Sequence, residues 1–111
     1  MSLTDDHFED IVRAVLAVSQ PAAIILFGSY ARGDVHQFSD LDLLVIRKKE
    51  FRTGESRRKE LGLLYRSISK ICGVPKDIIL FTKSEFQSWK NTTNHMAASA
   101  SKEGRVLYGQ V

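Results

Sequence analysis

Residues 22–46 read AAIILFGSYARGDVHQFSDLDLLVI, and this stretch decides both the fold and the chemistry of the chain. Its two apolar runs, 22–27 and 41–46, have the length and composition of strands that are buried on both faces of a sheet. Between them come a glycine–serine turn, a segment suited to a short helix over 29–32, and a polar loop. The stretch therefore predicts two neighbouring inner strands with a cluster of polar groups at the connection between them.

The segments on either side predict helices that pack on this sheet. Residues 4–18 carry an apolar stripe at helical spacing, and Thr4 is a suitable N-terminal cap. Residues 56–72 repeat apolar side chains at three- and four-residue steps, and Gly73 is the expected stop of this second helix. Helices that alternate with short apolar strands are typical of an α/β architecture.

The C-terminal third predicts one more strand and smaller helical pieces. Residues 77–82 (DIILFT) form the expected third strand, and a short helix opens at Lys83 and includes Trp89. A last helix is expected from Thr93 or Asn94 to Gly104, after which residues 106–108 dock as a tail. Four further side chains are predicted to lie in the core: Tyr65, Cys72, Phe86 and Trp89. The predicted fold is one α/β (α+β) domain over 1–111, with a small mixed sheet of about three to four strands.

Length, composition and cysteine content indicate the number of domains and the cellular compartment of the protein. The 111 residues suffice for one domain, and no apolar run approaches the roughly 20 residues of a membrane span. The N-terminus, MSLTDDHFED, is acidic and has no basic region of the kind that begins a secretory signal. Cys72 is the only cysteine and cannot form an internal disulfide. Together these features predict a cytoplasmic protein.

The net charge is +3, and basic residues gather at 47–49 and 57–59. One interpretation is a surface for nucleic acid or another acidic partner. The alternative is structural: 47–49 end a strand, and 57–59 lie on a solvated helix face. The absence of interleaved aromatic side chains favours the structural interpretation.

Asp40 and Asp42 are the first candidates for chemistry. Alternate residues of a strand share a face, so the two carboxylates are expected to project together at the start of the second strand. Paired carboxylates repel one another unless a cation neutralises them, and hard oxygen ligands suit Mg²⁺ or Mn²⁺. Asp77 begins the third strand and is predicted to be a third carboxylate beside them. Three such groups could hold two ions.

Gly28, Ser29 and Arg32 form the second group of candidates. A glycine where a strand turns into a helix lets backbone N–H groups approach a phosphate, and the Ser29 hydroxyl adds a donor. Arg32 would reach the same phosphates as a charged donor. The pattern is neither a Walker A loop nor a dinucleotide-binding G-x-G-x-x-G. The two groups together predict a site for a metal–nucleoside triphosphate.

The spacing G-S-x10-D-x-D, within GSYARGD…SDLDLLV, resembles the minimal nucleotidyltransferases of the DNA-polymerase-β-like superfamily. The likeness extends to the leading helix, the DIILFT strand and the EGRVLY tail. It implies transfer of a nucleoside monophosphate, with ATP and Mg²⁺ expected, to an acceptor hydroxyl. In that family Gly28 and Ser29 match the phosphate-binding pair, Asp40 and Asp42 the metal-binding pair, and Asp77 the third carboxylate.

The resemblance also implies a partner. Small members of the family are typically encoded with a helical HEPN-type protein, an RNase toxin, which the nucleotidyltransferase neutralises as antitoxin by adenylylating a tyrosine. Two other classes stay open from the sequence. One is an antitoxin or scaffold that acts by contact alone, and the other is a nucleotidyltransferase for a small molecule or RNA.

Overall fold

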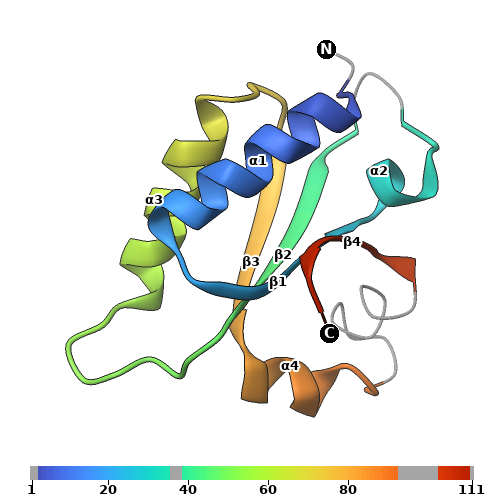
Figure 1. The fold of residues 1–111 in the computed structure, drawn as a ribbon. Helices are drawn as coiled ribbons and strands as arrows, with labels where there is room; N and C mark the ends of the chain where they lie inside the picture. The colour runs from blue at the N-terminus through green and yellow to red at the C-terminus, as the bar shows by residue number, and fades with distance from the viewer. Residues whose placement is uncertain (1–2, 36–38, 93–102, 111) are drawn as a thin grey trace.

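The computed structural model describes residues 3–35, 39–92 and 103–110, which build a four-stranded mixed sheet in the order β3-β2-β1-β4 (Figure 1). Inner strand β1 runs antiparallel to both of its neighbours, whereas β2 and β3 are parallel. The strands are β1 (Pro21–Phe27), β2 (Leu41–Arg47), β3 (Lys76–Thr82) and β4 (Arg105–Gly109). The helices are α1 (Asp5–Val18), α2 (Ser29–Arg32), α3 (Arg57–Ser69) and α4 (Lys83–Trp89). The α/β class and the small mixed sheet predicted from the sequence are confirmed.

The two inner strands are covered on both faces, as their continuous apolar runs predict. On one face, β1 and β2 contribute to the main core under α1 and α3, which lie side by side across the sheet (Figure 1). On the other face a smaller apolar cluster forms around Phe86 of α4. No helix in the described part of the chain is both long and apolar enough to cross a membrane.

Both long helices begin directly after a capping residue, but α3 does not end at the residue predicted to stop it. Helix α1 begins directly after Thr4, as predicted. Helix α3 begins after Ser56, whose hydroxyl accepts a hydrogen bond from the backbone N–H of Lys59 at 3.2 Å. The prediction that Gly73 stops this helix is wrong, because α3 already ends at Ser69. The N–H groups of residues 71 and 72 both bond the carbonyl of Ile68, which tightens the chain into a final turn.

The C-terminal region differs from the prediction in two described places. Residues 106–108 do not simply dock as a tail but belong to β4, which pairs with the free side of β1. Trp89 is not a core residue: it is 44% exposed, because it is the last residue of α4. Phe86 and Cys72 are buried as predicted, and Tyr65 is half-buried. The helix expected from Thr93 or Asn94 falls almost entirely outside the described residues.

Candidate active site

Gly28 ends β1 in a backbone conformation that other residues rarely adopt, with φ 72° and ψ −154°. Its carbonyl accepts hydrogen bonds from the N–H groups of Ala31 and Arg32 and so starts the short helix α2. A Cβ atom added at Gly28 would overlap Oδ2 of Asp42 on the neighbouring strand. Glycine is therefore required both by the turn and by the close approach of this carboxylate.

The register of the sheet places two of the candidate carboxylates side by side. Asp42 of β2 is the partner of Phe27 on β1 and of Asp77 on the parallel strand β3. Residues opposite one another in register share a face of the sheet. Leu43 and Ile78, one residue further along their strands, belong to the core under α1 and α3. Asp42 and Asp77 consequently project from the other face.

The electrostatic field at Asp42 shows which charged groups surround it. Partial burial raises the pKa of Asp42, and the negative charges of Asp77 and then Asp40 raise it further. The Arg32 guanidinium acts in the opposite direction and lowers this pKa. Two further carboxylates and one guanidinium thus lie close enough to Asp42 to act on its charge, at the end of β2 next to Gly28.

The remaining phosphate-binding candidates lie on α2. Ser29 is its first residue, is half-buried, and has a hydroxyl with no hydrogen-bond partner among the described residues. Arg32 is exposed, and its Nε lies 3.4 Å from Oδ2 of Asp34. Such an exposed contact contributes little to stability, so the guanidinium can exchange it for a phosphate at small cost.

The donor set fits a hard divalent cation that is completed by its substrate. Within residues 3–35, 39–92 and 103–110, no three His, Cys, Asp or Glu side chains are arranged to hold one ion by themselves. Mg²⁺ seldom needs such a cage, since it usually takes one or two carboxylates and fills its shell with phosphate oxygens and water. Burial, followed by the negative charges of Asp77 and Asp40, raises the pKa of Asp42, and a bound cation would offset the contribution of these charges.

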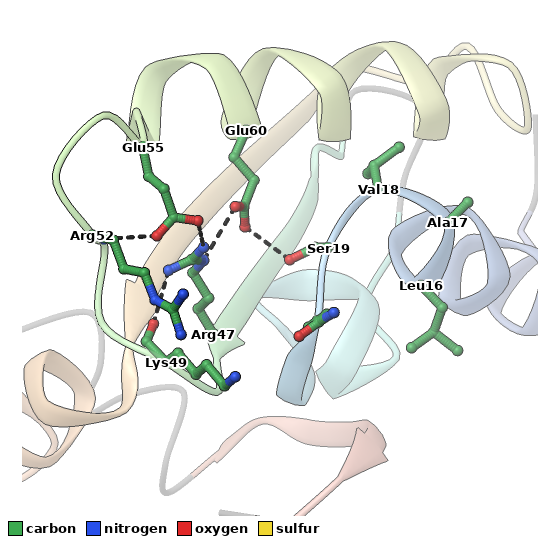
Figure 2. A pocket seen from close by; sticks show the side chains of 10 residues that line it. Leu16, Ala17, Val18, Ser19, Arg47, Lys49, Arg52, Glu55 and Glu60 are labelled. Atoms are coloured by element: carbon green, nitrogen blue, oxygen red, sulfur yellow. Dashed lines mark hydrogen bonds and ion pairs between the residues drawn. The ribbon is translucent and has the colours of Figure 1, made fainter.

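A second charged cluster lies at the far end of β2. The sequence pattern did not predict that these residues lie together. Arg47 lies in a hollow of about 480 Å³ between the end of α1 and the loop that leads into α3 (Figure 2). Its guanidinium forms ion pairs with Glu55 at 2.6 Å and Glu60 at 3.2 Å. Oε2 of Glu60 in turn accepts a hydrogen bond from the Ser19 hydroxyl at 2.8 Å. No spacing in the sequence signals this cluster, because its members come from separate segments.

Comparison with known proteins identifies the family. The model of the nucleotidyltransferase domain family matches residues 8–108, which is most of the chain. The chain therefore belongs to the nucleotidyltransferase domain family. The matched range includes the glycine turn, both strands that carry the aspartates, and β4.

Two curated relatives come from Methanocaldococcus jannaschii. "Putative protein adenylyltransferase MJ0604" is 36% identical over 85 residues, which are 77% of this chain and 76% of the relative. "Putative protein adenylyltransferase MJ1305" is 44% identical over 66 residues, 52% of this chain and 45% of the relative. The matched stretch thus spans less than half the length of the second relative.

Among solved structures, the tri-AMPylated Shewanella oneidensis HEPN toxin in complex with MNT antitoxin contains a chain of the same fold. The TM-score is 0.63 at 14% sequence identity, and the match covers 96% of this chain and 74% of that one. At this identity the likeness establishes the shared fold alone.

Proposed function

We propose that the protein is a Mg²⁺-dependent nucleotidyltransferase that transfers AMP from ATP to a hydroxyl group of a partner protein. We propose further that it acts as the antitoxin of a HEPN/MNT pair, with a small helical HEPN-type toxin as that partner. The observation that carries the proposal is the register pairing of Asp42 with Asp77 beside the glycine turn at Gly28. The names of the two curated relatives and the toxin–antitoxin complex of the same fold support it.

The residues of the chain divide the work of binding and positioning. Gly28 lets the Asp42 carboxylate lie directly against the glycine turn, because it carries no Cβ. The Ser29 hydroxyl and the Arg32 guanidinium would hold the β- and γ-phosphates as hydrogen-bond donors. Positioning and charge neutralisation, rather than covalent chemistry by the protein, supply most of the rate in phosphoryl transfer.

The transfer step is an in-line displacement at the α-phosphorus. The hydroxyl oxygen of the partner forms a new bond to this phosphorus while the bond to the bridging oxygen of the β-phosphate breaks, and pyrophosphate leaves. Asp77 would accept the hydroxyl proton or hold the hydroxyl in line, and its register position across from Asp42 supports this role.

Asp40, Asp42 and Asp77 would hold the metal, with two Mg²⁺ ions expected and Mn²⁺ as a possible substitute. The bound ions would neutralise the triphosphate and lower the pKa of the attacking hydroxyl. Because the three carboxylates do not by themselves enclose an ion, we expect metal and ATP to bind together.

Intact-mass measurement of the HEPN-type partner tests the proposal. After incubation with this protein, ATP and Mg²⁺, the partner should gain the mass of one or more AMP units. Excess EDTA should abolish the gain, and transfer that persists in EDTA would contradict the metal role. The comparison of ATP with the other three nucleoside triphosphates then identifies the base.

A cell-based assay separates catalysis from contact. If Asp42→Asn still protects cells from the partner, neutralisation occurs by binding alone and catalysis is incidental. If the partner gains no mass while a small molecule or an RNA does, the acceptor assignment is wrong and the transferase assignment stands. A cytoplasmic location stays a prediction of the sequence.

A further inference from the structure

Strand β3 is an edge strand whose outward backbone groups meet α3. It ends the strand order β3-β2-β1-β4, so alternate N–H and C=O groups point away from β2. The hydroxyl of Tyr65 accepts a hydrogen bond from the N–H of Ile78 at 3.0 Å. Nη1 of Arg57 donates to the carbonyl of Leu80 at 2.8 Å. Side chains of α3 therefore take the place of the missing neighbouring strand.

Helix α3 and strand β3 run in opposite directions, so residues further along β3 meet residues nearer the start of α3. Near the start of β3, Nζ of Lys76 donates to the Ser69 hydroxyl at the last turn of α3, at 3.2 Å. Tyr65 binds further along the strand, and Arg57, the first residue of α3, binds further still. Helix and strand are thus fastened at three points along the whole edge.

The contact of Tyr65 is the one that bears on the candidate active site. The N–H that it binds belongs to the peptide unit that joins Asp77 to Ile78, so the hydroxyl fixes the orientation of the backbone directly after Asp77. Ile78 is buried under α3, with 2% of its surface exposed, and Asp77 therefore has to face the opposite side of the sheet. On its other side, β3 is held by β2, where Asp77 is in register with Asp42.

We infer that Tyr65 is a positioning residue, which holds Asp77 beside Asp42 by binding the outward N–H group of Ile78. This inference rests on the proposed function for the meaning of Asp77, but the hydrogen bond itself is independent of it. Tyr65 lies on the core side of the sheet, opposite the face from which Asp77 projects. Its effect passes through one backbone peptide.

Tyr65→Phe is the test variant, because it removes the hydroxyl and keeps the aromatic ring that packs in the core. The matched control is Tyr108→Phe, the same change on β4 at the opposite edge of the sheet, where no hydrogen bond of the hydroxyl is found within the described residues. Arg57→Gln is a second control, since it loosens the same edge at Leu80, three residues beyond Asp77.

The first measurement is amide hydrogen exchange at Ile78, followed by NMR without any substrate. We expect exchange at least tenfold faster in Tyr65→Phe than in the wild type, and no change in Tyr108→Phe. Unchanged protection in Tyr65→Phe would overturn the inference, because the hydroxyl would then not be the partner of this N–H.

The second measurement separates kcat from KM in the transfer of labelled nucleotide to the partner. A small displacement of a group at the reacting centre costs rate more than substrate binding, so kcat should fall about ten- to a hundredfold while KM for ATP stays within about twofold. Arg57→Gln should lose thermal stability to a similar or larger extent than Tyr65→Phe but keep kcat within about threefold. Equal losses of kcat in these two variants would reduce Tyr65 to a structural residue.

A wild-type protein that transfers no nucleotide would refute the proposed function without deciding the inference. Binding of Mn²⁺ in the presence of a non-hydrolysable ATP analogue, measured by electron paramagnetic resonance, then replaces the kinetic readout. A fall in Mn²⁺ affinity of at least threefold in Tyr65→Phe alone supports the inference, and equal affinity in all variants overturns it.

Discussion

The two ends of β2 differ in the charges that surround their ionised side chains. Asp42 stands near the start of the strand, and Arg47 is its last residue. The neighbours of Asp42 are mostly of its own sign, since Asp77 and Asp40 raise its pKa and Arg32 only partly opposes them. Arg47 is held by opposite charges, Glu55 and Glu60.

At the Arg47 end, the guanidinium is saturated by groups of the chain itself. Besides its two ion pairs (Figure 2), it donates to the carbonyls of Lys49 and Glu50 and lies 4.3 Å from the ring centroid of Phe51. Its side chain is 13% exposed. A charge that is satisfied this fully inside the protein stabilises the fold and has little left to offer a ligand.

At the Asp42 end, like charges are gathered, and no described residue donates a hydrogen bond to the Asp42 carboxylate. Such an arrangement costs stability unless a cation is bound, and sites of this kind persist where function requires them. This difference supports the proposal that the end of β2 with Asp42 is the working end of the strand. Each prediction below changes one end and leaves the other intact.

The largest effect is expected for Asp42→Asn in the transferase assay. Loss of one carboxylate from the metal-binding set should reduce the transfer rate by about a thousandfold, equivalent to roughly 4 kcal/mol in activation free energy. The matched control is Asp10→Asn, which removes a carboxylate of α1 that forms an exposed ion pair with Arg13. A rate for Asp42→Asn within tenfold of the wild type would contradict the assignment of the working end.

Arg47→Met should have the largest effect on stability. It leaves the half-buried Glu60 and the more exposed Glu55 without their partner, which we expect to cost about 3 kcal/mol of unfolding free energy, chiefly through Glu60. Arg13→Met is the control, since its ion pair with Asp10 is exposed and should contribute less than about 1 kcal/mol. Urea denaturation measures both. Transfer activity per folded molecule should be unchanged, and a specific loss of activity would mean that the two ends are coupled.

Gly28→Ala tests whether the close contact between Gly28 and Asp42 matters for activity. The new Cβ would need a strained backbone and would collide with Asp42, so we expect about 2 kcal/mol of lost stability and a roughly hundredfold slower transfer. Gly33→Ala separates the two causes, because Gly33 also has a positive φ of 80° but has open space around it. It should lose about 1 kcal/mol of stability and little activity. Equal losses of activity in both variants would argue against the contact with Asp42.

The parts of the fold that depend on residues close together in the sequence could be predicted, and those that depend on distant segments could not. Apolar runs and a capping residue such as Thr4 can be recognised in consecutive residues, and they located three strands and both long helices. Strand β4 was missed because its pairing depends on the free side of β1, which only the assembled sheet defines. Trp89 was misplaced for a related reason, since helical spacing does not reveal where α4 runs past the sheet.

The candidate site was predictable to the extent that chemistry and strand geometry determine it. Glycine before a serine, and aspartates two residues apart, indicate a phosphate turn and a shared face, and the register places Asp77 beside Asp42. The hydrogen bond from the backbone of β3 to Tyr65 was not predictable. Tyr65 was expected only as a core residue, because its hydrogen bond to Ile78 joins two elements 13 residues apart.

The smallest expected effect is a pH-dependent gain of stability in Asp42→Asn without metal. The pKa of Asp42 is raised in the folded protein, first by burial and then by Asp77 and Asp40. The folded state therefore binds this proton more tightly than the unfolded state. The resulting contribution to stability is fully present below the unfolded pKa of about 3.9 and is lost as the pH rises through the higher folded value.

At neutral pH the wild type therefore bears a repulsion that the neutral asparagine lacks. Asp42→Asn should be more stable than the wild type by about 0.5 kcal/mol, the size of interactions between solvent-exposed charges, and this gain should vanish near pH 3. Mg²⁺ together with a non-hydrolysable ATP analogue should stabilise the wild type more than the variant, because binding to the folded state alone shifts the unfolding equilibrium. Thermal unfolding of both proteins between pH 3 and 8 measures each effect. A wild type that is more stable than the variant at neutral pH without Mg²⁺ would mean that Arg32 already compensates Asp42, and that both ends of β2 are satisfied internally.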